Sequence, residues 1–388
     1  MLAIVAVGYK RKKPLQRLLD CLNQADYCGD NDVRLIISLD RADNCEEMRA
    51  LAEAFEWKHG YKEVILHPKR LGLREHFLFC GDLTQKYGSI IFLEDDVYAL
   101  PEYYRFAKAC VEKYENDERI AGASLYSLRY SETAHRPFTP LNDGTDVYFA
   151  QLMSWAPVYF PKQWKAFRDW YDLEPKPMDD ISCLPDNVRQ WKMTSFKKYH
   201  IKYTITHNKY FVYPQISFTT NFAEAGQHYA KDDDNLQVPL MIGNVEKYRL
   251  PSLEESKSLY DAYMEMTPEC VKRHFTELND FDFSVDLYGN KRRENISTKY
   301  VITDKKSRKP IRMWGCKTVP QESNIFLDVP GETFTLSNVD DVIYFPRSIT
   351  SLYGKVSYDI KGASPLKAFA TDVRILIEEL KTRVRRVK

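Results

Sequence analysis

Four short apolar runs, separated by amphipathic helical patterns, lie in the first hundred residues and restrict the possible folds most strongly. The runs cover residues 2–7, 33–39, 64–66 and 90–93. The runs over 2–7 and 90–93 are continuous rather than alternating, which is typical of a strand buried on both faces. Strands that alternate with helices in this way form a parallel sheet with helices on both sides. The sequence therefore predicts an α/β fold with a mostly parallel, doubly wound, Rossmann-like sheet.

Polar or glycine residues follow the end of each of these four strands. They are Arg11, Asp40, Gly72 and Asp96. Because the carboxyl ends of parallel strands meet at one edge of a sheet, we expect these residues to lie close together. Ligands of open α/β sheets bind at that edge. The sequence therefore predicts a binding site of nucleotide type.

The fourth strand ends in three consecutive acids, Glu94-Asp95-Asp96. Adjacent carboxylates repel one another, so the group favours a bound cation unless it forms a solvated turn. Mg²⁺ or Mn²⁺ bridging carboxylate and phosphate oxygens suits such a site. If the strand continued through the acids, Glu94 and Asp96 would share one face and Asp95 would lie on the other.

Several function classes are disfavoured by what the sequence lacks. It has no P-loop pattern and no GxGxxG after the first strand, where Gly8 stands alone. The net charge of +1 gives the protein no overall positive potential that would attract nucleic acid. Eight scattered cysteines without a CxxC pair argue against a zinc cage or a disulfide scaffold, so we expect reduced thiols and a cytoplasmic protein. Residues 1–7 are too short for a signal peptide, and no apolar stretch approaches a membrane span.

Four segments, in this order, resemble nucleotide-sugar glycosyltransferases of GT-A fold. The patterns are similar to those of N-acetylglucosaminyltransferase I and of bacterial family 2-like enzymes of surface polysaccharide assembly. The resemblance covers roughly residues 1–235. The segments are residues 6–11 with the following Leu-rich helix, residues 37–40, residues 92–97 with 101–104, and residues 214–228.

The resemblance implies roles for individual residues. Asp96 would bind Mn²⁺ or Mg²⁺, as the last acid of a DXD-type motif, beside donor contacts from Glu94 and Asp95. Arg11 would meet the diphosphate, Asp40 would bind the uracil of a UDP-sugar, and His228 would close the site near the diphosphate. The other residues assigned to substrate binding are Gly8, Gly72 and Arg74.

The resemblance also implies inversion at the anomeric carbon, which needs a base for the acceptor hydroxyl. Asp186 is the best match, before a helix with Trp191, although Pro185 departs from the family pattern. Asp179 and Asp180 are rivals, and Asp186 could instead simply cap the helix. Trp155 falls where such enzymes place an acceptor wall, but core packing explains it equally well.

We expect two parts: residues 1–240, a glycosyltransferase domain, and residues 241–388, an extension of unknown role. Within the domain, residues 1–128 would bind the nucleotide sugar, and residues 129–240 would bind the acceptor and catalyse transfer. We expect a helix over 188–199 and short strands over 286–362.

An amphipathic last helix over 364–388 ends in basic residues. It could anchor the protein on the inner face of a membrane or be an ordinary packed helix.

The sequence thus predicts a metal-dependent inverting glycosyltransferase that moves a hexose or N-acetylhexosamine onto a glycan or lipid-linked saccharide. A nucleotidyltransferase would show a Gly-rich, basic pattern after the first strand, which residues 8–11 do not match. A non-catalytic glycan- or nucleotide-binding module would bind the donor without turnover.

Overall fold

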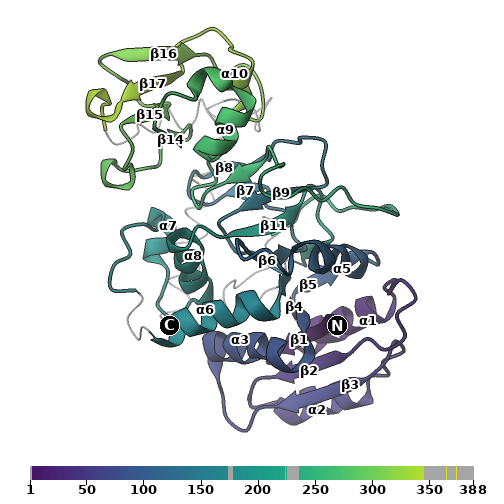
Figure 1. The fold of residues 1–388 in the computed structure, drawn as a ribbon. Helices are drawn as coiled ribbons and strands as arrows, with labels where there is room; N and C mark the ends of the chain where they lie inside the picture. Colours follow the sequence, from purple (N-terminus) through teal and green to yellow (C-terminus); the bar gives the residue numbers. More distant parts are fainter. Residues whose placement is uncertain are drawn as a thin grey trace. The chain divides into compact units, whose positions relative to one another are not determined.

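The computed structural model describes residues 2–173, 178–222, 224, 236–344, 364 and 373. Its largest element is a nine-stranded mixed sheet (Figure 1). The strands, in chain order, are β1 (Leu2–Gly8), β2 (Leu35–Leu39), β3 (Lys62–Leu66), β4 (Ser89–Glu94), β6 (Ile120–Ser124), β9 (Val147–Ala150), β10 (Pro157–Tyr159), β11 (Tyr210–Pro214) and β13 (Leu259–Tyr260).

The order across this sheet is β13-β9-β11-β6-β10-β4-β1-β2-β3. β4, β1, β2 and β3 are mutually parallel, whereas β10 runs antiparallel between β4 and β6. β1, β2 and β4 are almost entirely buried, which explains their continuous apolar sequences. The predicted α/β class with a parallel-rich sheet is confirmed.

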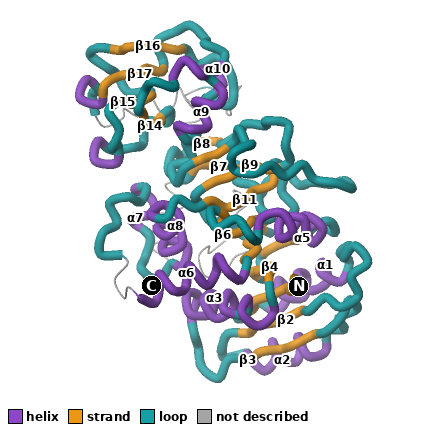
Figure 2. Tube along the Cα trace, in the orientation of Figure 1, coloured by secondary structure: helices purple, strands orange, loops and turns teal. Residues whose placement is uncertain are grey.

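Helices cover both faces of the sheet (Figure 2). α1 and α2 follow strands that step toward one edge, whereas α3 returns the chain from β3 to β4, so right-handed crossovers place α3 on the opposite face. α3 packs there against α6 and α8. The helices of this region are α1 (Lys12–Asn23), α2 (Cys45–Ala54), α3 (Gly72–Asp82), α4 (Thr84–Tyr87), α5 (Tyr103–Tyr114), α6 (Pro161–Leu173), α7 (Asp186–Gln190) and α8 (Phe196–Thr206).

Two smaller pairs of strands lie outside the main sheet. β5 (Val97–Ala99) follows the acidic residues directly and pairs antiparallel with β12 (Thr219–Asn221). The amide of Phe222 continues this ladder to the carbonyl of Asp96 at 2.7 Å. The pair therefore brings residues 219–222 beside the acidic turn. The other pair is β7 (Tyr130–Ser131) with β8 (Arg136–Pro137).

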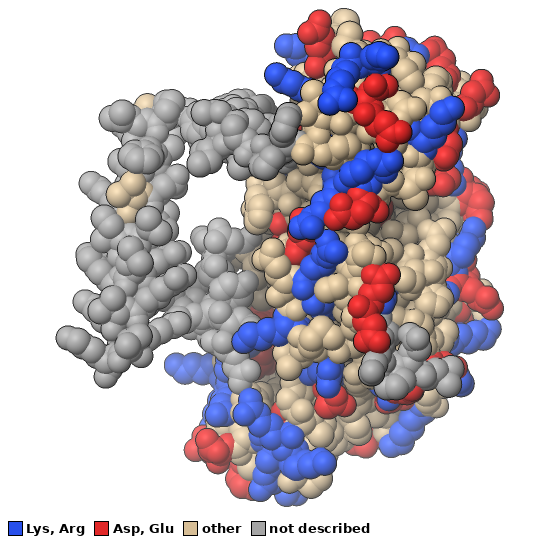
Figure 3. Space-filling model, turned by 90° about the vertical axis from the view of Figure 1, so that its left-hand side faces the viewer, with Lys and Arg blue, Asp and Glu red and all other residues tan. Residues whose placement is uncertain are grey.

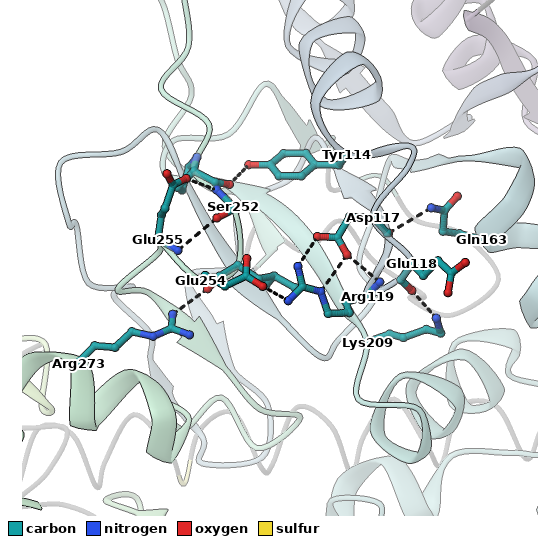
Figure 4. Close-up of polar contacts among 12 residues, drawn as sticks. Tyr114, Asp117, Glu118, Arg119, Gln163, Lys209, Ser252, Glu254, Glu255 and Arg273 are labelled. Atoms are coloured by element: carbon teal, nitrogen blue, oxygen red, sulfur yellow. Dashed lines mark hydrogen bonds and ion pairs between the residues drawn. The ribbon is translucent and has the colours of Figure 1, made fainter. Parts of the chain in front are cut away.

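The main sheet continues past residue 240, where the sequence analysis placed a domain boundary, because β13 pairs in parallel with β9. The segment before β13 is fixed by polar contacts (Figure 4). Arg119 forms ion pairs with Asp117 and Glu254, and Arg273 donates to the carbonyls of Leu253 and Ser256 at 2.7 and 2.6 Å.

A four-stranded sheet follows β13, in the order β14-β15-β17-β16. Its core contains Trp314, Ile302 and Leu336, all fully buried. This agrees with the short strands expected over 286–362 as far as residue 344, and residues 345–362 lie outside the described part of the chain. Its elements are α9 (Pro268–His274), β14 (Phe283–Asp286), β15 (Tyr300–Thr303), β16 (Pro310–Trp314), α10 (Ser323–Phe326) and β17 (Phe334–Asn338).

Residues 344–388 form a separate unit. The predicted terminal helix over 364–388 lies outside the described residues, apart from Ser364 and Val373. Among the described residues, no helix is both long and apolar enough to cross a membrane. The face seen in Figure 3 mixes basic and acidic side chains, in keeping with the net charge of +1.

One buried carboxyl in the four-stranded region predicts a measurable pH dependence. Glu322 accepts a hydrogen bond from the Tyr260 hydroxyl at 2.6 Å, and burial raises the pKa of Glu322 to about 7. The folded state therefore favours the protonated form, and this stabilisation is present below pH ~4.5 and lost as the pH rises through 7. Glu322→Gln should leave stability at pH 4 unchanged and raise it by up to about 3 kcal/mol at pH 8.

Denaturant unfolding at both pH values measures this effect. Glu277→Gln is the matched control, because Glu277 is exposed and pairs with Arg312 at the surface. It should change stability by less than about 1 kcal/mol at either pH. Equal effects of Glu322→Gln at pH 4 and pH 8 would contradict the interpretation.

Candidate donor-binding site

The acidic residues form a turn rather than a continued strand. β4 ends at Glu94, and Asp95 and Asp96 make the turn into β5. The Arg11 guanidinium contacts both aspartates, through Nε to Asp95 Oδ2 at 3.2 Å and through Nη2 to Asp96 Oδ2 at 3.2 Å. The alternation of faces was expected only if the strand continued through the acids, and it does not apply, because the strand ends at Glu94.

Burial and charge oppose one another at this turn. Burial raises the pKa of Asp95 to about 6, although the hydrogen bond from Arg11 acts in the other direction. Burial, and then repulsion from Asp96, raise the pKa of Glu94. Burial disfavours the charged form of Arg11, yet its pairing with Asp95 and Asp96 raises its pKa overall. Arg11 is therefore a permanent cation that holds the turn together.

Asp96 retains an oxygen that can take a further ligand. Its Oδ1 atom is buried and has no hydrogen-bond partner among the residues that the structure describes. A buried acceptor without a partner is costly, and a divalent cation would satisfy it. Within the described part of the chain, no three His, Cys, Asp or Glu side chains form a ready-made metal cage. The turn thus fits a cation held by one carboxylate and by a ligand's phosphates, which is the usual mode for Mg²⁺.

Asp40 organises the loop that enters α3. Its Oδ1 accepts from the amide of Leu71 at 2.7 Å, and its Oδ2 accepts from the amide of Gly72 at 2.9 Å. Asp40 is only 4% exposed. Gly72 has a φ of +78°, a conformation that favours glycine. The structure thus joins Asp40 and Gly72, as their positions at strand ends predicted, and both carboxylate oxygens of Asp40 already have backbone partners.

Tyr9 is a site residue that sequence reasoning missed. It follows β1, and its ring lies between Lys10 and Arg70, whose cationic groups are 5.1 and 5.2 Å from the ring centre. Arg70 belongs to the loop that Asp40 holds in place. An aromatic ring beside two cations at this edge could stack on a planar base. Its only signal in the sequence was its position after the first strand.

A second missed group lies on the other side of the acidic turn. The Arg17 guanidinium stacks 3.8 Å from the centre of the Phe222 ring and pairs with Glu224 at 2.7 Å. Phe222 in turn stacks on Tyr98 with ring centres 5.9 Å apart. Phe222 is 42% exposed. This places an aromatic surface and a cation next to Asp96.

Two further predicted residues occupy the wall opposite. Arg74 donates to the carbonyl of Met193 at 3.2 Å and to the Tyr199 hydroxyl at 3.4 Å, so it ties α3 to α8. Trp155 lies under the ammonium of Lys197, 4.0 Å from the ring centre. Lys197 is also close enough to Glu94 to lower that carboxyl's pKa against the effect of burial. Trp155 is therefore linked to Glu94 through Lys197.

The predicted base lies apart from the turn. Asp186 begins α7 and pairs with Arg189 at 3.4 Å and with Arg292 at 2.9 Å. These described contacts are with α7 and with the 286–297 region rather than with the acidic turn. The rivals, Asp179 and Asp180, are exposed. Asp180 accepts from the amide of Ser182 at 2.8 Å, and hydrogen bonding to Ser182 lowers its pKa.

The remaining predicted residues have simple placements. Gly8 ends β1, where a Cβ would lie 3.1 Å from methyl carbons of both Leu15 and Leu39. Its lack of a side chain therefore allows α1 to pack closely on the sheet. His228 lies outside the described residues, although the chain leading to it passes Asp96 through Phe222.

No protein-family model and no curated protein matches the sequence. Similar solved structures include S. aureus TarS 1–349 in complex with UDP-GlcNAc, at 12% identity and a TM-score of 0.39, covering 58% of this chain and 60% of that one. They also include the mannosyltransferase PcManGT from Pyrobaculum calidifontis in complex with GDP-Man and Mn²⁺, at 11% identity and a TM-score of 0.33, covering 55% and 56%. The chain thus spans less than two thirds of these chains.

Proposed function

We propose that this protein is a metal-dependent, inverting glycosyltransferase that uses a nucleotide-diphosphate sugar, most simply a UDP-sugar. One observation carries the proposal: four parallel strand ends bring Arg11, Asp40, Gly72 and Asp96 to one edge of the sheet. At that edge the Arg11 guanidinium bridges Asp95 and Asp96. The edge also holds the buried Oδ1 atom of Asp96, which has no partner among the described residues. These are the parts needed to bind a diphosphate together with a divalent metal.

On the donor side, each residue has a distinct task. Asp96 would hold Mn²⁺ or Mg²⁺, and that ion would neutralise the diphosphate as it leaves. Arg11 would turn from the acids toward the phosphates, where its planar fork suits phosphate oxygens. The loop that Asp40 holds in place, together with Tyr9, would enclose the nucleobase of the donor. Glu94 and Asp95 would contact the ribose or the sugar.

On the acceptor side, the base would take the proton of the attacking hydroxyl as the bond to the diphosphate breaks on the opposite face. Asp186 remains the candidate base, with Trp155 as a wall between donor and acceptor. We propose a glycan or lipid-linked saccharide acceptor in surface polysaccharide synthesis. A cytoplasmic location with peripheral membrane contact through the basic terminal helix remains part of the proposal.

Donor binding and turnover are tested separately. Thermal shift with UDP, GDP and a panel of their sugars, with and without Mn²⁺, should show stabilisation by one nucleotide that increases when the metal is added. Slow release of free nucleotide from the matching sugar, without acceptor, should follow. Binding without any release would favour the non-catalytic module. Release of pyrophosphate from a nucleoside triphosphate and a sugar phosphate would favour a nucleotidyltransferase.

The assignment of the base predicts a selective loss of transfer. Asp186→Asn should reduce transfer to acceptor by about 100-fold or more, because general bases contribute about 10²–10⁴-fold. Donor binding should stay within about twofold of wild type, because Asp186 does not touch the acidic turn. Asp180→Asn and Asp179→Asn are matched controls on exposed carboxylates. A large loss in one of these controls, with activity retained in Asp186→Asn, would reassign the base.

A further inference from the structure

A cavity with a volume of about 290 Å³ is lined by residues other than those of the acidic turn. One wall consists of Ser182 and Cys183, before α7, and Ile205, in α8. The other wall comes from residues 291–297, near the four-stranded sheet. The two walls are joined by a hydrogen bond from Asn295 Nδ2 to the carbonyl of Ser182 at 2.6 Å. Pockets at such junctions are common ligand sites, and this volume is at the small end of their range.

The lining of the cavity combines apolar and polar groups, and its charged side chains are Lys291, Asp261 and Glu294. Lys291 and Asp261 form an ion pair at 2.5 Å, and Glu294 adds a second carboxylate. The side chains of Ser297 and Gln151 add further hydrogen-bonding groups to the lining. Each of these carboxylates has a cationic partner, because Glu294 pairs with Arg292 at 3.6 Å. A phosphate or uronate would have to compete with the carboxylates for these cations, which disfavours anionic ligands. Closely spaced donors and acceptors suit a neutral molecule with many hydroxyl groups.

An aromatic ring adds the apolar component of the site. Tyr263 lines the cavity and is 7% exposed, and the ammonium of Lys291 lies 5.3 Å from its ring centre. A ring held in this way offers an apolar surface beside fixed polar groups, which is the usual composition of a small-molecule pocket. A sugar ring presents both kinds of surface.

The position of the cavity relates it to the proposed transfer site. α8 connects the two, because Lys197, near Glu94, is at its start and Ile205, which lines the cavity, is near its end. Eight residues of α-helix span about 12 Å. Arg292, which pairs with Asp186, is adjacent in sequence to Lys291. The cavity therefore lies on the side of the predicted base, beyond the reach of the sugar being transferred.

We propose that this cavity binds a neutral sugar residue of the acceptor glycan, one or more units away from the hydroxyl that is glycosylated. The proposal rests on the proposed function for the identity of the ligand as acceptor, but the binding itself can be measured independently. It also gives residues 286–297 a role, as the part of the chain that closes the acceptor side.

The test fills the cavity and measures saccharide binding directly. Ser297→Trp places a large ring in the lining, and Lys299→Trp is the matched control, since Lys299 is exposed and does not line the cavity. The probes are methyl glycosides of neutral hexoses and N-acetylhexosamines, with methyl glucuronide as the anionic comparison. Saturation-transfer NMR measures their binding. Acceptor-free release of nucleotide from the donor is measured on the same samples.

The expected result is binding of at least one neutral glycoside that weakens tenfold or more in Ser297→Trp and stays unchanged in Lys299→Trp. Glu294→Gln, which removes one charge without adding bulk, should weaken the same probe and provides a second variant if Ser297→Trp does not fold. Absence of neutral glycoside binding, equal binding in Ser297→Trp, or tighter binding of the glucuronide would overturn the proposal.

Donor turnover separates failure of this site from failure of the proposed function. Nucleotide release that is unchanged in both tryptophan variants, without glycoside binding, would reject the cavity alone. If the wild-type protein binds a glycoside but releases no nucleotide, the cavity is still a saccharide-binding site, but its role in binding a glycosyltransferase acceptor is rejected.

Discussion

Asp96→Asn is expected to abolish metal-dependent turnover while leaving the fold intact. The loss should be at least about 100-fold, or roughly 3 kcal/mol of transition-state stabilisation, because the carboxylate that would hold the cation is replaced by a weaker neutral ligand. The change is nearly isosteric, and Asp96 is a turn residue whose backbone carbonyl, not its side chain, continues the ladder to Phe222. Nucleotide release at several Mn²⁺ concentrations measures the effect.

Asp43→Asn is the matched control, since Asp43 is an exposed acid near the same sheet edge that pairs with Lys10 at 3.8 Å. It should retain activity within about twofold. Normal metal-dependent turnover in Asp96→Asn would remove Asp96 from the metal site, and the role of the acidic turn would then have to be assigned to Glu94 and Asp95 alone.

Gly81→Ala is expected to destabilise the protein by about 2–3 kcal/mol. A Cβ at Gly81 would lie 1.9–2.3 Å from ring atoms of Trp164, whose indole is 1% exposed and donates to Asp82 at 2.8 Å. Alanine normally favours a helix over glycine by about 1 kcal/mol, so a net loss can come only from overpacking. Denaturant unfolding measures the change.

A double-mutant cycle identifies the cause. In a Trp164→Leu background the added methyl group has room, so Gly81→Ala should be much less harmful there than in wild type. Gly243→Ala is the control, because no atom lies within 4 Å of a Cβ at that position. Equal losses in both backgrounds would show that the cause is not the contact with Trp164.

The sheet and its functional edge could be predicted because buried parallel strands have continuous apolar sequences. That pattern can be recognised in the local sequence. Because ligands of open α/β sheets bind at the carboxyl ends of the strands, the predicted strand ends also predict the position of the site. It predicted that Arg11, Asp40, Gly72 and Asp96 share one sheet edge, and in the structure Arg11 contacts Asp96 and Asp40 contacts Gly72.

The helix expected over 188–199 shows where local patterns fail. The structure instead ends α7 at Gln190 and begins α8 at Phe196. The ammonium of Lys198 binds the carbonyls of Arg189 and Trp191 at 2.8 and 2.9 Å, and Phe196 stacks on Phe77 with ring centres 3.8 Å apart. These contacts depend on the folded chain, so residue periodicity could not reveal the break.

The site residues that sequence reasoning missed also depend on distant partners. Arg17 pairs with Glu224, 207 residues away, and Tyr9 meets Arg70 from another loop. For Asp40, the family resemblance implied contact with the uracil of the donor, whereas its oxygens already accept from the backbone amides of Leu71 and Gly72. This edge therefore contains a carboxylate that holds a loop, Asp40, and a carboxylate with a buried oxygen that no described residue contacts, Asp96.

The bridge from Arg11 to Asp95 and Asp96 has a consequence for the order of binding. A cation that approaches Asp96 alone meets a guanidinium already in place, so metal without nucleotide has to displace it or bind beside it. A nucleotide diphosphate offers Arg11 another anionic partner and at the same time supplies oxygens for the cation. Each ligand should therefore strengthen the other, and linkage requires the effect to be equal in both directions. Arg11 would act as an internal counter-ion that keeps the acidic turn folded until donor and metal arrive together.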